Sequence, residues 1–135
     1  MAKKTWIEKR DAKKEFVVKT IDKKFADIPE GSRMLIATPQ IINTYVNNIP
    51  FGKTRELTTM RTDLAATYNT DKTCPVTAGI FLRIVAEAAY EELENNGSIE
   101  QITPFWRIVS PNSKLAKKLS CGEAFIINQR IKEGC

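Results

Sequence analysis

The residue types that most often carry acid–base and nucleophilic chemistry are scarce in this chain. It has 135 residues and no histidine, which excludes Ser-His-Asp and Cys-His catalysis and zinc sites built on imidazole. The three cysteines, Cys74, Cys121 and Cys135, show no Cys-x-x-Cys spacing, so neither a disulfide framework nor a cysteine-only zinc site is expected. We therefore expect no metal, no cofactor and a reducing, cytoplasmic location.

Cys74 is the thiol whose sequence position most favours reactivity. It directly precedes Pro75, where a long helix is predicted to begin, and a helix N-terminus lowers the pKa of a thiol. A redox or nucleophilic role for Cys74 is thus an alternative, although the chain has no histidine to act as its base. Gly52-Lys53 lacks the spacing of a phosphate-binding loop.

The net charge of +5 is concentrated at the two ends of the sequence. Residues 1–25 hold nine basic and four acidic residues, and residues 107–135 hold six basic and two acidic ones. Residues 26–106, by contrast, hold ten acidic and six basic residues. Two basic ends predict a face that binds a polyanion such as nucleic acid. The alternative is two ordinary solvated surfaces.

Apolar spacing and turn residues predict five helices and one hairpin. Val17, Ile21, Phe25 and Ile28 recur every three or four residues and predict a helix over 6–28. Helices over 38–47, 58–68 and 73–95 are predicted from the start signals Thr38-Pro39, Thr58-Thr59 and Cys74-Pro75, and Asn96-Gly97 ends the last of these. A terminal helix is predicted over 123–132. Residues 105–109 and 114–119 are predicted to form a strand and its returning partner.

This order of elements predicts an α+β fold. A short helix, a turn and a second helix form a helix-turn-helix, and the hairpin that follows makes the arrangement winged-helix-like. We assign residues 38–135 to this domain and residues 1–37 to an added, basic N-terminal helical extension. The apolar runs are too short for a membrane span.

Candidate DNA contacts surround the predicted turn. The small residues Thr77 and Gly79 would let the second helix approach a DNA groove closely, with tight helix packing as the alternative. The remaining candidates for phosphate or groove contact are Lys53, Arg61, Lys72, Thr73 and Arg83. For the basic residues among them, plain surface charge is the alternative.

Phe105 and Trp106 offer aromatic faces on which a base can stack. Neighbours on a strand point to opposite faces, so we expect Phe105 to line a pocket and Trp106 to pack in the core. The alternative is that both rings belong to the core. Arg107 lies beside this pocket, and we expect it to make a structural hydrogen bond or salt bridge.

Several short blocks occur in an order typical of one family. They are Ile49-Pro50-Phe51-Gly52-Lys53, Thr58-Thr59, Asp63-Leu64-Ala65, Val76-Thr77-Ala78-Gly79, Pro104-Phe105-Trp106-Arg107-Ile108-Val109, Gln129-Arg130 and Glu133-Gly134. From about Ile41 to Gly134 the chain resembles the C-terminal DNA-binding domain of alkylguanine-DNA alkyltransferases (methylated-DNA–protein-cysteine methyltransferases). It is more similar still to their non-catalytic relatives, the alkyltransferase-like proteins.

The resemblance implies a DNA-binding protein that is not an enzyme. Active members carry Pro-Cys-His-Arg-Val where this chain has Phe105 at the alkyl-acceptor position and Trp106 at the histidine position. A phenyl ring has no lone pair with which to accept an alkyl group. Alkyltransferase-like proteins also have an aromatic residue there and bind alkylated guanine without repairing it, so the implied partner is double-stranded DNA.

The chain departs from the family at two positions that help rotate a nucleotide out of the duplex. The family's tyrosine falls on Met60 or Arg61, and its arginine falls on Cys74 or Pro75. The alternative function is a protein-interaction module on the same scaffold that has lost nucleic-acid binding. Its contact face would be the acidic segment Glu87, Glu91, Glu92 and Glu94.

Overall fold

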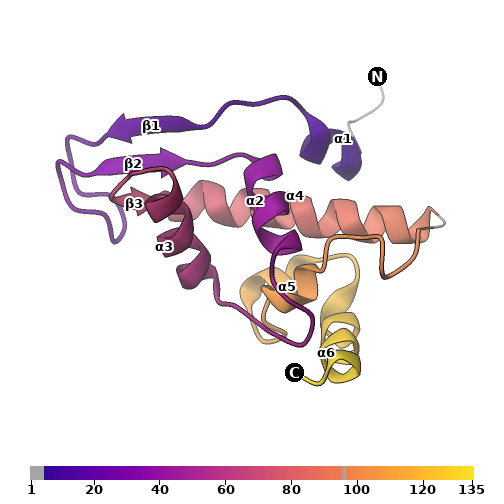
Figure 1. Ribbon diagram of the computed structural model, residues 1–135. Helices are drawn as coiled ribbons and strands as arrows, with labels where there is room; N and C mark the ends of the chain where they lie inside the picture. The colour runs from indigo at the N-terminus through magenta and orange to yellow at the C-terminus, as the bar shows by residue number, and fades with distance from the viewer. Residues whose placement is uncertain (1–4, 96) are drawn as a thin grey trace.

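The long helix α4 (Pro75–Glu94) runs through the middle of the molecule, with the N-terminal segment on one side and the C-terminal helices on the other (Figure 1). The computed structural model describes residues 5–95 and 97–135. Helices α1 (Trp6–Asp11) and α2 (Pro39–Asn47) make the most extensive helix contacts with α4. The other helical elements are α3 (Leu57–Thr67), the 3-10 helix η1 (Phe105–Arg107), α5 (Lys114–Lys118) and α6 (Gly122–Glu133).

Three strands form one small sheet in the order β1 (Val17–Thr20), β2 (Arg33–Ile36), β3 (Lys72–Thr73). β1 pairs with β2 in antiparallel register, with Val18 opposite Leu35, and β3 pairs with β2 in parallel, with Thr73 opposite Leu35. β2 lies in the expected extension, residues 1–37, and β3 lies in the expected domain, residues 38–135. The two parts therefore share one sheet.

The core has a large and a small part. The large cluster joins α2, α3, α4, η1 and the C-terminal helices, and its fully buried members include Leu35, Ile42, Leu82 and Val85. The small cluster, on the sheet and the loop after β1, consists of Ile21, Ile28, Met34 and Cys74. Burial of these apolar side chains is the main favourable term in folding.

The structure confirms the α+β class and four of the five predicted helices. α2 begins at the predicted Thr38 cap, whose hydroxyl accepts a hydrogen bond from the backbone N–H of Ile41, and Pro39 is its first residue. α4 likewise begins with a proline, Pro75. The connection between α3 and α4 is longer than a tight turn, because residues 72–73 form β3 within it.

The predicted helix over 6–28 is wrong beyond Asp11. Thr5 and Glu8 form a capping box that starts α1, but the helix ends at Asp11, and Val17–Thr20 is strand β1. Val17, Val18 and Thr20 are β-branched, and β-branched residues favour strands. The recurrence of apolar residues from Val17 to Ile28 does not reflect a helix. Ile21 and Ile28 meet in the small cluster because a loop, not a helix, joins them.

The predicted hairpin over 105–119 is also wrong. Phe105–Arg107 is a 3-10 turn, and Lys114–Lys118 is helix α5, capped by the Ser113 hydroxyl, which accepts from the N–H of Ala116. The backbone carbonyls of Trp106 and Val109 accept hydrogen bonds from Arg130 instead of from a partner strand. The winged-helix arrangement is therefore not present in the form that the sequence predicted.

No helix within residues 5–95 and 97–135 combines the length and the apolar character needed to cross a membrane.

The small cluster predicts a clear stability effect. Ile28 is fully buried there, and Ile28→Ala should lower the free energy of unfolding by about 3 kcal/mol, since it removes buried methylene groups and leaves a cavity. The matched control Val17→Ala, at a half-exposed site on β1, should cost less than about 1 kcal/mol. Urea unfolding of both variants measures this, and equal costs would mean that the small cluster does not hold the loop.

Candidate nucleic-acid interface

The first turns of α4 are buried on one side, at Ala78, and present an exposed face on another. Val76 and Ile80, one turn apart, are each 53% exposed. Gly79 shares this side of the helix, and a Cβ built on it would meet no atom within 4 Å. We call Val76, Gly79 and Ile80 the exposed α4 face. It is a smooth surface without long side chains, as expected if a groove or a partner approaches it closely.

Two of the predicted contacts on α4 lie beside this face rather than in it. Thr77 and Arg83 are partly buried, and neither the Thr77 hydroxyl nor the Arg83 Nε has a hydrogen-bond partner among the described residues. The Arg83 guanidinium carbon lies 5.5 Å from the centre of the Trp6 ring, a cation–π geometry. Arg83 thus packs on α1 in this structure.

Arg61 and Thr73 hold the fold together around β3. The two terminal nitrogens of Arg61 donate to the Asp27 carboxylate at 2.9 and 2.8 Å, and its Nε donates to the Thr73 carbonyl at 3.0 Å. The Thr73 hydroxyl donates to the Arg61 carbonyl at 2.7 Å. The Arg61 hydrogen bonds lower the pKa of the Asp27 carboxyl. Both predicted contact residues are therefore engaged within the protein.

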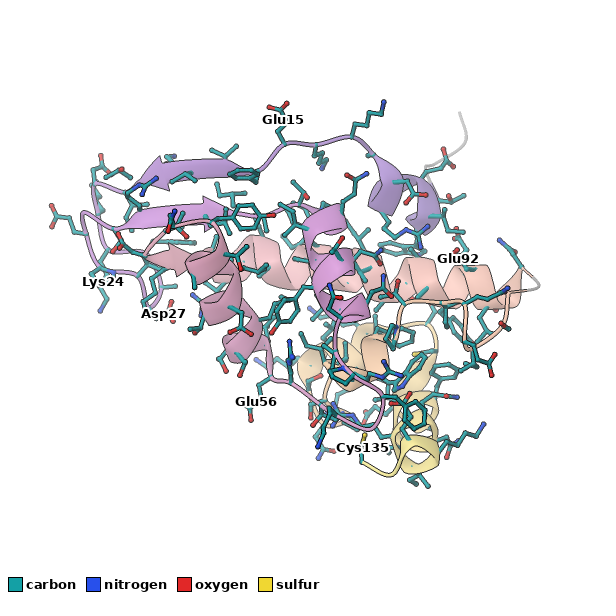
Figure 2. The ribbon with its side chains drawn as sticks, viewed as in Figure 1. Glu15, Lys24, Asp27, Glu56, Glu92 and Cys135 are labelled. Atoms are coloured by element: carbon teal, nitrogen blue, oxygen red, sulfur yellow. The ribbon has the colours of Figure 1, made fainter. Side chains whose placement is uncertain are left out.

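Lys53 and Lys72 are exposed, as a phosphate contact requires. Lys72 lies in β3, at the end of the molecule where α4 begins (Figure 1). The loop between β1 and β2 reaches the same end, and β1 with this loop carries three exposed lysines, Lys19, Lys23 and Lys24, which we call the hairpin lysines. Figure 2 shows Lys24 near Asp27 at this end.

The described parts of the two basic ends, residues 5–25 and 107–135, do not form one face, and Lys3 and Lys4 lie outside the described residues. In Figure 1 the N-terminal segment and β1 lie on one side of α4, whereas α5 and α6 lie on the other. The prediction that both ends assemble a single polyanion-binding surface is wrong. The exposed lysines at the end of the molecule where α4 begins come from β1, the loop after it and β3.

Phe105 and Trp106 are core residues, with 0% and 1% of their surface exposed. The Phe105 ring is stacked on Phe125 with centres 5.8 Å apart, and Trp106 meets Phe105 edge-on at 5.5 Å. In this 3-10 turn the two neighbouring rings contact each other, whereas neighbours on a strand would point to opposite faces. The expectation that Phe105 lines a pocket is wrong for this structure, and the core alternative holds.

Arg107 makes the predicted salt bridge, and its partner is Glu133 near the end of α6. The guanidinium donates to both Glu133 carboxylate oxygens at 2.8 and 3.0 Å and to the Ile49 carbonyl at 2.8 Å. Glu133 also accepts from the Trp106 indole N–H at 2.7 Å and from the Gly52 N–H at 3.3 Å. This carboxylate joins three segments that are distant in sequence.

Burial and hydrogen bonding act in opposite directions on Glu133. Burial raises the pKa of this carboxyl, but the hydrogen bonds from Arg107, Trp106 and Gly52 outweigh it and lower the pKa below its usual value of 4.5. The side chain is only 6% exposed, so the charged form depends on these donors. Glu133 is therefore ionised and paired near neutral pH.

A cavity of about 610 Å³ adjoins the aromatic block. Its walls include Ile108–Ser110 at the end of this block, Leu57 and Thr59 at the start of α3, Leu82 of α4, and Arg130. A cavity near the predicted pocket thus exists, but aliphatic and polar side chains line it in place of Phe105. Pockets for small ligands commonly have volumes of this order.

No protein family, curated protein or solved structure matched this chain in comparison. The interpretation of the site depends on its own geometry. Within the described ranges 5–95 and 97–135, no three side chains of the metal-binding types come together.

The acidic segment of α4 is largely used inside the protein. Glu87 is buried and accepts hydrogen bonds from the backbone N–H and the hydroxyl of Ser120. Glu91 accepts from the N–H of Ile7, and Glu92 forms a salt bridge with Arg10. Three of the four carboxylates that the alternative function requires therefore have partners, in α1 and in the segment between α5 and α6, and Glu94 is exposed.

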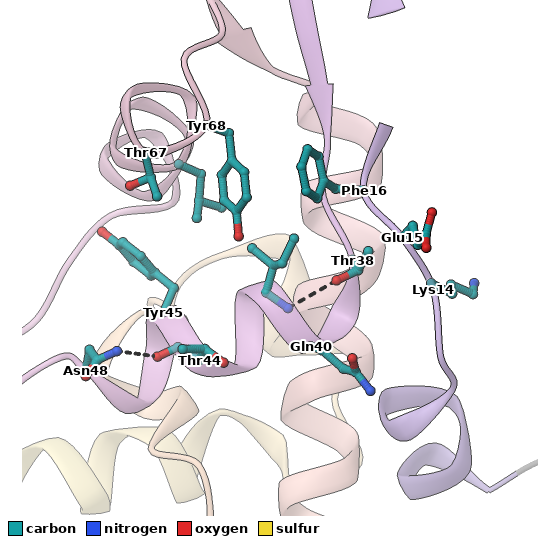
Figure 3. Close-up of a pocket in the computed structure, with 12 residues that line it drawn as sticks. Lys14, Glu15, Phe16, Thr38, Gln40, Thr44, Tyr45, Asn48, Thr67 and Tyr68 are labelled. Carbon is teal, nitrogen blue, oxygen red and sulfur yellow. Dashed lines mark hydrogen bonds between the residues drawn. The ribbon is translucent and has the colours of Figure 1, made fainter. Parts of the chain in front are cut away.

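The sequence analysis missed a groove along α2, with a volume of about 730 Å³ (Figure 3). Its aromatic walls are Phe16, Tyr45 and Tyr68, which come from the segment before β1, from α2 and from the end of α3. Tyr45 and Tyr68 each lie next to a predicted helix end, but no local pattern relates them to Phe16. Only the fold brings the three rings together.

The Glu133 network predicts an acid-sensitive contribution to stability. A carboxyl whose folded pKa is lowered stabilises the protein above its unfolded pKa of about 4.5, and this contribution is lost as the pH falls through the lower, folded value. Glu133→Gln should lower the free energy of unfolding at pH 7 by about 3 kcal/mol and flatten its decrease below pH 4.5. Denaturant unfolding across pH measures both effects. The control Glu100→Gln, at an exposed site, should change neither, and a wild-type-like pH profile for Glu133→Gln would contradict the account.

The three thiols should differ in reactivity. Cys135 is exposed and Cys74 is buried, while burial and the nearby Glu87 carboxylate raise the pKa of Cys121 to about 11. At pH 8 a disulfide reagent such as dithionitrobenzoate should modify Cys135 first, Cys121 slowly because little thiolate is present, and Cys74 only on unfolding. Mass spectrometry of the labelled peptides gives the order, and early labelling of Cys74 would revive a reactive role for it.

Proposed function

We propose that this chain binds double-stranded DNA without catalysing a reaction. The observation that carries the proposal is that the exposed α4 face, the hairpin lysines and Lys72 all belong to elements at the same end of the molecule. An α-helix fits the major groove, where apolar side chains contact thymine methyl groups. Lysines on either side of it would neutralise phosphates, which supply most of the affinity.

The proposed binding mode is winged-helix-like in a modified form. α3 and α4 follow one another in the order of a helix-turn-helix. The β1–β2 hairpin, which lies before these helices in the sequence, would take the place that a wing occupies. In this mode Lys72 and the hairpin lysines contact the phosphates of the DNA backbone, and Val76 and Ile80 contact the edges of the bases.

The sequence resemblance to alkyltransferase-like proteins supports a narrower version, in which alkylated guanine is recognised but not repaired. The 610 Å³ cavity beside Ile108–Ser110 has room for a base. Phe105 fills the acceptor position and is buried, and the raised pKa of Cys121, about 11, disfavours its thiolate. These observations support binding without alkyl transfer.

A second candidate is a protein-interaction module. Val76 and Ile80 are both apolar and exposed, and exposed apolar pairs on a helix also serve as protein contacts. The exposed α4 face would then be the contact surface, in place of the acidic segment. The two candidates differ in whether the hairpin lysines matter.

The salt dependence of DNA binding tests the proposal. If the three hairpin lysines and Lys72 neutralise phosphates, the logarithm of the affinity should fall with the logarithm of the salt concentration with a slope of about −4. Replacing the three hairpin lysines by glutamine should reduce this slope by about 3, since each phosphate contact contributes about 0.9. Fluorescence anisotropy with one labelled duplex measures both slopes.

The matched control replaces three exposed lysines on α5, Lys114, Lys117 and Lys118, which lie on the other side of α4. These variants should keep the wild-type slope. If the slope decreased equally in the hairpin-lysine variant and in the α5-lysine variant, DNA would not bind at the proposed surface. If the affinity of the wild type did not depend on salt, the protein-interaction candidate would remain. A second duplex with one O-alkylated guanine tests the narrower version, which requires tighter binding to the lesion.

A further inference from the structure

The groove along α2 is separate from the proposed DNA surface and has the features of a ligand site. It lies between α2, α3 and residues 14–16, and its volume of about 730 Å³ is within the range of small-molecule pockets. Leu64 and Ile41 form its apolar floor. Figure 3 shows the opening bounded by Tyr45 and Tyr68 on one side and by the 14–16 segment on the other.

Three aromatic rings give the groove flat walls. The Phe16 and Tyr68 rings lie 4.7 Å apart, centre to centre, and are tilted by 56°. Phe16 remains 44% exposed, so its contact with Tyr68 leaves much of the ring open to a ligand. Flat aromatic walls bind flat ring systems by stacking, a contact that every nucleobase can make.

The polar groups of the groove include a fixed hydrogen-bond acceptor. The Gln40 side-chain nitrogen donates to the Asp11 carbonyl at 3.2 Å, which holds the amide and leaves its oxygen to accept. In Figure 3 this oxygen lies on the groove side of the side chain. The Tyr68 hydroxyl also points into the groove and has no hydrogen-bond partner among the described residues. A ligand with an N–H donor at the edge of a flat ring matches these groups.

Charge at the groove is balanced. Lys14 and Glu15 both border it, and the Lys14 amine lies 5.4 Å from the centre of the Phe81 ring, where it makes a cation–π contact. The opening therefore offers no net charge to a phosphate. Affinity must come from stacking and from the polar edge, so it should depend little on salt.

We propose that this groove binds an unpaired nucleobase that carries an exocyclic amine, with the ring against Phe16 and Tyr68 and the amine donating to the Gln40 side-chain oxygen. Cytosine and adenine have such an amine, whereas uracil and thymine present a carbonyl oxygen at that edge. A free nucleoside and a single-stranded segment both present such a base, and the experiment below distinguishes these two sources. The proposal goes beyond duplex binding and uses different residues.

Titration with cytidine and uridine, followed by protein NMR or calorimetry, tests the proposal. Cytidine has an amino group at the ring position where uridine has a carbonyl oxygen, and only the amino group can donate to the Gln40 side-chain oxygen. The wild type should therefore bind cytidine about 10-fold more tightly than uridine. Gln40→Leu should abolish this preference, and Tyr68→Leu should weaken the binding of both by about 10-fold. Phe51→Leu, at an exposed aromatic residue outside the groove, is the matched control and should bind as the wild type.

Equal affinity for the two nucleosides, no binding, or unchanged binding in Tyr68→Leu would each overturn the proposal. A short deoxycytidine oligonucleotide in the same titration distinguishes the sources. Binding of the oligonucleotide with the same dependence on Tyr68 identifies a single strand as the ligand, and binding of the nucleoside alone identifies a free metabolite. The hairpin-lysine variant should retain cytidine binding, so failure of the duplex proposal and failure of this one give different results.

Discussion

The middle of helix α4 is buried from two sides, while its first turns keep one exposed face. Its buried residues run from Ala78 through Leu82 to an unbroken stretch at Val85–Ala89. α1 and α2 cover it along one side, and η1 contacts it from the other. A helix so enclosed cannot shift without disrupting the core. The position of the exposed α4 face is therefore fixed by packing, which is the property that a surface for recognition requires.

The C-terminal part of the chain is anchored by one buried carboxylate. Glu133 binds Arg107 and the Trp106 indole, and through Gly52 it also holds the loop that leads to α3. Leaving either charge of such a pair unpaired in the interior is costly. Trp106 and Arg107 thus have a structural role, and the 610 Å³ cavity opens beside Ile108 and Val109.

Helices with strong start signals could be predicted from the sequence, and pairings between distant segments could not. The local pairs Thr38-Pro39 and Cys74-Pro75 predict where α2 and α4 begin. In contrast, β1 forms because Val17–Thr20 pairs with Arg33–Ile36. The local spacing of apolar residues does not distinguish such a strand from a helix. Arg61 is a plausible phosphate contact by type and position, yet Asp27, 34 positions earlier, occupies its guanidinium. The aromatic groove joins three segments and has no signature in any one of them.

In the proposed binding mode, DNA contacts the exposed α4 face and the β1–β2 hairpin. Amide chemical-shift mapping of the isotope-labelled chain with a short duplex would locate the contact surface. We expect the largest shifts at Val76–Ile80, at residues 19–24 and at Lys72, and little change in α5 and α6. Shifts concentrated on α5 and α6, or none at low salt, would contradict it.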